Sequence, residues 1–454
     1  MNSTFKTTAL LSQVEIKPSA LYEIREHLTL LCREPELQDA FFEYCLKWKM
    51  APWINIQLKR YELIDFFDQD VRGRFESEYQ KTLNENEQRT TIAHRFLKAF
   101  NDNGIDVIIL KGNLFAATIY QDTGYKKMND FDILVKKEDW PKIHKIYLGL
   151  GFIPLGFGWS GEKEEETKFS HTAIPFISPD FKCIIGTQWG LKSPTTNFSV
   201  DIKQAWSTAT PFLVAGAACK QLSPAYNLLH LILHMGIYKC GIRDCMDVYN
   251  LIASETWNTE ELFALIESAN AAEKARFTFE MCNLCTDTIP DGWLQRLAFK
   301  DASFIGTRLV KRKKMFAETG DIHLSYHDYF QDIEKNVIYL NLFPKFHHRL
   351  HFYGKILKMI YFPDIKHSLK FIDKFHKPTA MNKIKGRVQG PWFSFSIIAQ
   401  EIGWKVTGLL FIKLFFDVML SPVNYVFPKE SYFDYLRKNN IDPKHIKKVV
   451  NDVQ

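Results

Sequence analysis

The chain has 454 residues, enough for two or three domains with a substantial core. Its composition, with 46% hydrophobic and 24% charged residues, is that of a globular protein and excludes a low-complexity or fibrous chain. The formal charge of +6 is uneven, because residues 301–454 carry 25 Lys/Arg against 14 Asp/Glu and the preceding residues carry an excess of acids.

Residues 1–103 are predicted to form a helical region. Apolar side chains recur there at three- and four-residue spacing, which is typical of amphipathic helices. The predicted helices span residues 21–32, 37–48, 53–67 and 72–101. Pro18, Pro35 and Pro52 separate them, and Gly104 signals the end of the last one.

Residues 104–215 are predicted to form an α/β core. The apolar run at 107–110 indicates a buried strand, and residues 114–120 indicate a helix that follows Lys111-Gly112. A second strand is predicted over residues 131–135. Further strands are expected over residues 152–155, 170–177, 181–188 and 199–202, and a helix over residues 138–150.

Asp130 and Asp132 stand at the start of the second strand, and both side chains point to one face because the strand period is two. Two neighbouring carboxylates repel each other unless a cation lies between them, and Mg²⁺ favours a few carboxylate oxygens together with substrate phosphates. The alternative is a strand end with two solvated acids. Gly112 lets phosphates approach the backbone at the helix start, where free N–H groups favour anions.

The run from residue 104 to residue 152 resembles the uncharacterised nucleotidyltransferase family of the polymerase-beta-like nucleotidyltransferase superfamily. The residues that carry the resemblance are Leu110-Lys111-Gly112, Tyr120, Lys126, Asp130, Asp132-Ile133-Leu134-Val135 and Gly151-Phe152. The resemblance implies an α+β fold with a mixed-sheet core and helical N-terminal and C-terminal regions. It also implies Mg²⁺-dependent transfer, with Mn²⁺ as the alternative metal, of a nucleotidyl group from an NTP to a hydroxyl acceptor.

The resemblance assigns roles to individual residues. Asp130 and Asp132 would hold the metal and act in catalysis, and Lys111 and Gly112 would steady the phosphates. Lys126 stands where the family usually has arginine. It keeps the charge but loses the planar fork that binds phosphate through two hydrogen bonds.

Two-metal nucleotidyl transfer normally uses a third carboxylate, and at that position this chain departs from the family pattern. In the family it lies in a strand that reads V/I-E-I/L-H-W, which corresponds here to Ile185-Gly186-Thr187-Gln188-Trp189. Gly186 therefore stands at the acid position. Asp201 would substitute as the third catalytic carboxylate if the strand predicted at 199–202 pairs nearby. Otherwise the site binds metal weakly or has lost nucleotidyl transfer.

Residues 216–300 are predicted to be helical. The expected helices span residues 225–238, 242–253, 259–271 and 274–286. Arg243 is expected to form structural ion pairs with Asp244 and Asp247, and contact with phosphate is the alternative.

The histidines and cysteines leave further interpretations open. His230 and His234 lie one helical turn apart. They are either zinc ligands or the polar tips of side chains on a packed helix. His171 either touches nucleotide or is a buried structural histidine. A second zinc site would require four cysteines to come together. These are Cys240, Cys245, Cys282 and Cys285.

Residues 301–454 are predicted to be a basic, aromatic-rich helical region broken by prolines. Its basic clusters, such as Lys311-Arg312-Lys313-Lys314, are either solvated faces or a contact with an anionic surface or an acidic substrate. Nothing in the sequence resembles a nucleic-acid-reading motif, so nucleic acid is not an expected partner. The expected partners are an NTP and an unidentified hydroxyl acceptor, which is a small molecule, a glycan or a peptide.

The N-terminus lacks the basic start and apolar core of a signal peptide, and no stretch has the apolar length needed to span a bilayer. The nearest, residues 406–420, is interrupted by Lys413 and Asp417. These features predict a cytoplasmic protein, in which the eight cysteines are reduced and buried.

The sequence as a whole predicts a Mg²⁺-dependent nucleotidyltransferase. The competing hypothesis is a degenerate nucleotidyltransferase fold that binds nucleotide or phosphate without transfer, and Gly186 motivates it.

Overall fold

The structure is a computed structural model, and it describes residues 3–128, 130–155, 170–194, 196–235, 240–299, 303–323, 436 and 438–442. Most of these residues belong to one compact unit, which joins the chain up to Pro194 with Phe198–Leu324. The predicted helical region at 301–454 lies mainly outside the described residues. Over the described ranges, every helix is too short or too polar to cross a bilayer.

The N-terminal region is helical, as predicted. Its helices are α1 (Ser3–Leu11), α2 (Pro18–Leu31), α3 (Pro35–Lys47), α4 (Ala51–Arg60), the 3₁₀ turn η1 (Ile64–Phe66) and α5 (Gln69–Asp102). Pro18 and Pro35 begin helices, where the missing N–H costs no hydrogen bond. The helix predicted over 53–67 is shorter, because α4 ends at Arg60. After α5, Gly104 adopts a left-handed φ of 67° and ends the helical region.

A seven-stranded mixed sheet forms the core and confirms the predicted α+β class. The strands are β1 (Val107–Ile109), β2 (Phe131–Val135), β3 (Ile153–Pro154), β4 (Phe176–Ile177), β5 (Ile184–Gln188), β6 (Thr210–Val214) and β7 (Ala217–Gln221). Their order is β3-β4-β5-β2-β1-β7-β6. The central strand β2 pairs antiparallel with β1 and parallel with β5.

One strand prediction near the end of the core is wrong, and the sheet extends beyond the predicted core boundary. Residues 199–202 form no strand, because Asp201 is the N-cap of the helix α9 (Ile202–Ser207). The sheet also continues past residue 215, where the sequence placed the core boundary. A tight turn with Ala215 at φ 48° and Gly216 at φ 82° joins β6 to β7, and β7 runs parallel to β1.

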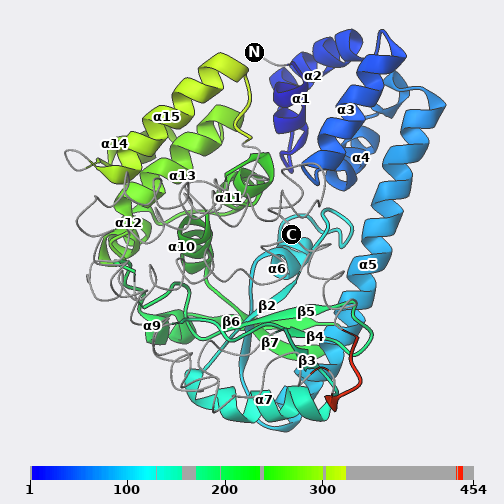
Figure 1. Cartoon of the computed structure of the whole chain (residues 1–454). Coiled ribbons are helices and arrows are strands. Elements are labelled where there is room, and N and C mark those ends of the chain that lie inside the picture. The colour runs from blue at the N-terminus through cyan, green and yellow to red at the C-terminus, as the bar shows by residue number, and fades with distance from the viewer. Residues whose placement is uncertain are drawn as a thin grey trace, which may run out of the picture. The chain divides into compact units, whose positions relative to one another are not determined.

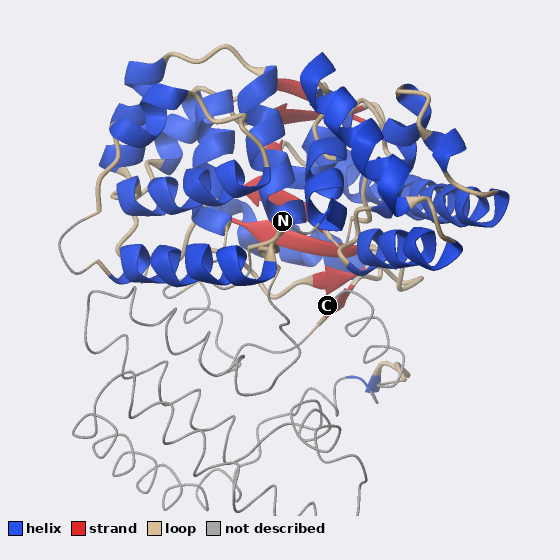
Figure 2. Ribbon diagram, turned by 90° about the horizontal axis from the view of Figure 1, so that it is seen from above, coloured by secondary structure: helices blue, strands red, loops and turns tan. Residues whose placement is uncertain are grey.

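The helices after the first strand include those predicted over residues 114–150 and 225–286, together with short helices at 137–139 and 291–295 that were not predicted. They are α6 (Lys111–Thr118), η2 (Lys137–Asp139), α7 (Trp140–Gly149), α10 (Pro224–His234), α11 (Ile242–Ser254), α12 (Thr259–Ser268), α13 (Ala272–Cys285), α14 (Asp291–Gln295) and α15 (Phe304–Thr319). Figure 2, which views the molecule from above, shows helices covering most of the strands.

The two faces of the sheet have different neighbours. Phe131 of β2 packs edge-on against Phe96 of α5, with ring centroids 5.7 Å apart. Thr187 of β5 lies 2.9 Å from the hydroxyl of Tyr147 in α7. Because strand side chains alternate, the Asp132 side chain lies on the opposite face of the sheet from Phe131. Gly186, its neighbour in register, occupies a position on that same face. Figure 1 shows α7 on one side of the sheet and α6 and α10 on the other.

Candidate active site

The site begins at the turn from β1 into α6. The backbone N–H of Leu110 donates to the carbonyl of Asp132 at 3.1 Å and extends the β1–β2 pairing by one residue. Lys111 then adopts φ 53°, a left-handed conformation that costs about 1–3 kcal/mol in a residue with a side chain. Its Nζ donates to Asp132 Oδ2 at 2.7 Å. The strained turn and the ion pair therefore occur at the same residue.

Asp132 is a buried carboxylate, 6% exposed, with partners on two sides. Lys111 binds one oxygen, and Gln188 Nε2 lies 3.4 Å from the other. Gly186 is its neighbour on β5, in direct register across the parallel pair. A Cβ on Gly186 would lie 2.2 Å from Asp132 Oδ1. The residue at the family's acid position is thus beside Asp132, and the Asp132 carboxylate occupies the space that a side chain at 186 would need.

The available donors match one magnesium ion better than two. Asp130 is exposed and precedes β2, two residues before Asp132. Mg²⁺ is commonly bound by one or two carboxylates together with substrate phosphates and water, which two aspartates can provide. Among the described residues, no group of three or more His, Cys, Asp or Glu side chains is arranged to hold a metal. The donor set fits one metal shared with a triphosphate and lacks the third acid that a second metal requires.

Asp201 lies on an exposed helix end. Its carboxylate accepts a hydrogen bond of 3.0 Å from the N–H of Gln204 and caps α9. The hydroxyl of Tyr226 donates to its carbonyl at 3.3 Å. The predicted role as third carboxylate required a strand at this point, and that condition is not met.

Gly112 lies in the first turn of α6, which no side chain caps. The hydroxyl of Tyr125 donates to the Gly112 carbonyl at 3.3 Å and supports the turn from one side. A Cβ at this glycine would meet Lys126 Cε at 3.5 Å, an ordinary contact. The first-turn N–H groups of α6 lie beside Lys111, and free N–H groups at a helix start favour anions.

The Lys126 side chain, which is 13% exposed, forms an ion pair with Asp247 of α11. Burial lowers the pKa of Lys126, and the carboxylate of Asp247 opposes that shift. The hydroxyl of Tyr120 donates to the other oxygen of Asp247 at 3.0 Å. Asp247, which was expected to pair with Arg243, therefore balances the charge of Lys126. This favours a structural role for Lys126 next to Gly112. Direct phosphate binding by Lys126 stays a prediction.

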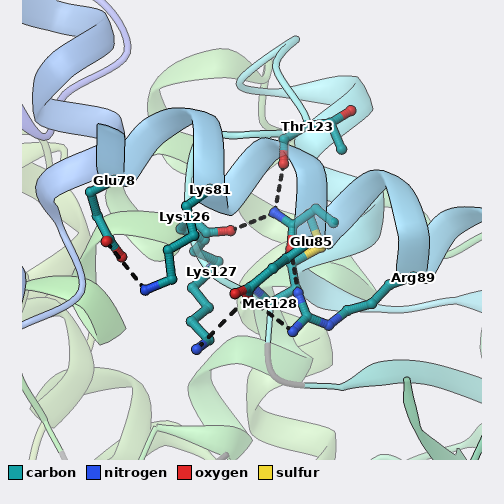
Figure 3. A network of polar contacts seen from close by, with 9 residues as sticks. Glu78, Lys81, Glu85, Arg89, Thr123, Lys126, Lys127 and Met128 are labelled. Carbon is teal, nitrogen blue, oxygen red and sulfur yellow. Dashed lines mark hydrogen bonds and ion pairs between the residues drawn. The ribbon is translucent and has the colours of Figure 1, made fainter. Parts of the chain in front are cut away.

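The loop between α6 and β2, which carries Lys126, is held against α5 by Asn86. Figure 3 shows Thr123, Lys126 and Met128 of this loop beside α5. Asn86 Nδ2 donates to the carbonyls of Thr123 at 2.7 Å and Lys126 at 2.9 Å. Its Oδ1 accepts from the N–H of Met128 at 3.3 Å. No sequence pattern identifies this residue, because a single asparagine within a long helix has no distinguishing spacing.

His171 lies beside the end of β5, where its carbonyl accepts from the N–H of Trp189 at 2.8 Å. Burial and the ammonium groups of Lys192 and Lys111 lower its pKa to about 4. His230 of α10 is also buried, and its pKa is lowered by burial and by Lys111. Both rings are therefore neutral at pH 7. Both lie close enough to Lys111 for its positive charge to lower their pKa.

The four cysteines considered as zinc ligands do come together between α11 and α13. The Sγ atoms of Cys240 and Cys245 are 3.9 Å apart, and hydrogen bonds to Cys240, Cys282 and Cys285 raise the pKa of the Cys245 thiol. All four are buried and free. The geometry at these described residues is nevertheless not that of a metal centre. They form a packed thiol cluster.

The model of the family described as "Uncharacterised nucleotidyltransferase" matches residues 35–287, which is more than half of the chain, and the chain belongs to this family. The matched segment runs from the start of α3 to just beyond α13 and includes the whole sheet. No curated protein and no solved structure matches the chain.

Proposed function

We propose that this member of the nucleotidyltransferase family transfers a nucleotidyl group from an NTP to a hydroxyl acceptor, with one Mg²⁺ held by Asp130, Asp132 and the triphosphate. The observation that carries the proposal is the contact of 2.7 Å between Lys111 and Asp132 at the start of α6. It brings a cation, a carboxylate and free helix N–H groups to one point. Mn²⁺ is the alternative metal.

The chain's own residues act through charge and position. When bound, the metal would neutralise phosphate charge and polarise the bond that breaks. Lys111 is a mobile point charge on a flexible stem, so its ammonium can reach a phosphate oxygen while it stays near Asp132. The first-turn N–H groups of α6 favour the same anion. As the acceptor oxygen bonds to the α-phosphorus and pyrophosphate leaves, these donors stabilise the negative charge on the leaving group.

A second candidate is a nucleotide- or phosphate-binding protein without transfer activity. Gly186 favours it, because no acid stands beside Asp132 to assist removal of the acceptor proton. The exposed cap position of Asp201 favours it as well. The phosphate-binding parts are the same in both candidates, so binding and transfer have to be measured separately.

Calorimetric titration of the four NTPs, with and without Mg²⁺, tests the proposal. We expect binding that requires Mg²⁺ and that weakens by more than about tenfold in Asp130→Asn and in Asp132→Asn, which corresponds to about 1.4 kcal/mol or more. Asp102→Asn, an exposed acid at the end of α5, is the matched control and is expected to bind like the wild type.

Pyrophosphate release in the presence of candidate acceptors then separates the two functions. NTP binding that is indifferent to Mg²⁺ and to Asp132→Asn would contradict the proposed metal site. Mg²⁺-dependent binding without pyrophosphate release for any hydroxyl acceptor would instead support the binding protein.

A further inference from the structure

Arg243 lies in the first turn of α11, and both acids expected to pair with it are engaged elsewhere. The carboxylate of Asp244 accepts a hydrogen bond of 3.0 Å from the N–H of Gly241. Asp247 forms its ion pair with Lys126. Within the described residues, the guanidinium of Arg243 forms neither an ion pair nor a hydrogen bond. The predicted structural ion pairs are therefore not formed there, and the charge of Arg243 is left unbalanced.

A soluble anion can reach Arg243, because this residue is partly exposed. No nitrogen of Arg243 belongs to the buried polar atoms that lack a hydrogen-bond partner within the described ranges. Since the guanidinium has no carboxylate partner in those ranges either, its N–H groups face solvent. Arginine carries five such donors in one plane, and here they are available to a ligand.

Helix α11 places Arg243 near the first turn of α6, on the same side of the sheet (Figure 1). Residues four apart share a helix face, so Arg243 lies one turn before Asp247 on the face that holds Lys126. The Cε atom of Lys126 would lie 3.5 Å from a Cβ at Gly112, and the hydroxyl of Tyr125 donates to the Gly112 carbonyl at 3.3 Å. Burial raises the pKa of Tyr125 and lowers that of Lys126, and the charge of Arg243 acts on both groups.

Arg243 differs from the two lysines at the first turn of α6 in its partners. Lys111 binds Asp132, and Lys126 binds Asp247. Of these three cations, Arg243 is the one that can bind an anion without giving up an ion pair within the described residues. Its planar guanidinium also supplies the fork for binding phosphate through two hydrogen bonds, which Lys126 lacks.

We propose that Arg243 binds the β- and γ-phosphates of the NTP, the part that leaves as pyrophosphate. This assignment rests on the proposed nucleotidyl transfer and adds a substrate-binding residue to it. Two parallel N–H groups of a guanidinium match two phosphate oxygens, and a fixed cation there would stabilise the charge of the leaving pyrophosphate. The same chemistry would suit a phosphate group on the acceptor, so the test has to distinguish these two sources.

The experiment titrates the full chain with each Mg²⁺–NTP, with Mg²⁺–pyrophosphate, and with inorganic phosphate in the presence of saturating Mg²⁺–NTP. We expect Arg243→Met to weaken Mg²⁺–NTP and Mg²⁺–pyrophosphate binding by about tenfold or more. Arg243→Lys keeps the charge and loses the fork, so it should recover only part of that affinity. Arg33→Met, at an exposed arginine between α2 and α3, is the matched control and is expected to bind like the wild type. Urea unfolding checks that each variant is folded.

Each outcome decides the assignment. Unchanged Mg²⁺–NTP and Mg²⁺–pyrophosphate affinity in folded Arg243→Met overturns it. A loss confined to inorganic phosphate assigns Arg243 to the acceptor and overturns the triphosphate contact. If the wild type binds no Mg²⁺–NTP but its pyrophosphate binding depends on Arg243, the proposed function fails, whereas the anion site at Arg243 stands. A wild type that binds neither ligand overturns both.

Discussion

Replacement of Gly186 by alanine tests the packing at the centre of the site. The added Cβ would lie 2.2 Å from Asp132 Oδ1, so the Asp132 carboxylate must swing away. That movement weakens the 2.7 Å contact with Lys111 and the 3.4 Å contact with Gln188. Overpacking costs about 1–3 kcal/mol and loss of a charged hydrogen bond about 1.5–3 kcal/mol, so we expect Gly186→Ala to lower the free energy of unfolding by about 2.5–6 kcal/mol.

Urea unfolding of a double-mutant cycle isolates the cause. In an Asp132→Ala background the obstructing carboxylate is gone, so Gly186→Ala should cost less than about 1 kcal/mol there. Gly73→Ala is the control, because Gly73 is an exposed position of α5 and nothing lies within 4 Å of the added Cβ. It should stabilise the protein by about 0.5–1 kcal/mol. A Gly186→Ala variant as stable as the wild type, or one equally destabilised in both backgrounds, would refute the steric argument.

Three further predictions address the surroundings of the site. Lys126→Met leaves the buried carboxylate of Asp247 without its cation, so it should cost about 3–5 kcal/mol in urea unfolding, and Asp247→Leu in the same chain should recover part of that loss. Asn86→Leu removes the bonds that hold the 123–128 loop and should cost at least about 2 kcal/mol and accelerate amide exchange of Met128; unchanged exchange would contradict the anchoring role. His171, with a folded-state pKa near 4 against about 6.5 unfolded, makes stability fall as pH drops from about 6.5 to 4, by up to ~1.4 kcal/mol per pH unit. His171→Asn should flatten that slope, and an NMR titration that finds its ring protonated at pH 6 would count against it.

Patterns within short stretches of the sequence predicted the elements whose formation depends mainly on neighbouring residues. Residues 131–135 form β2 with the predicted bounds, because a short run rich in aromatic and β-branched residues favours a strand. Pro18 and Pro35 mark helix starts, where proline is tolerated for its own backbone reasons. Lys111 and Asp132 were expected in one site, and they lie in direct contact.

The failures have a different origin, because they depend on partners that are distant in the chain. Strand β6 is largely exposed and carries a proline, and the turn after it is Ala215-Gly216 instead of an Asn-Gly pair, so neither hydrophobic alternation nor turn chemistry identified the hairpin. Lys126 meets Asp247 across 121 residues, a pairing that no spacing rule encodes. Lys192 and Lys274 likewise meet at the carbonyl of Leu233, each across 41 residues of the chain, and both look like ordinary charged positions in the sequence.

Gly186 changes what the site needs in order to be stable. A third acid at that position would place another negative charge beside Asp132, and such a group of carboxylates requires a resident cation. With glycine there, Lys111 and Gln188 already satisfy Asp132, so the buried charge is balanced by the chain itself. Lys111 then competes with any metal for Asp132 Oδ2, and a phosphate is the group best able to draw the ammonium away. If the proposed function holds, we therefore expect metal binding to depend on nucleotide binding: Mg²⁺ alone would meet an occupied carboxylate, whereas Mg²⁺ with a triphosphate would offer both Asp132 and Lys111 a new partner.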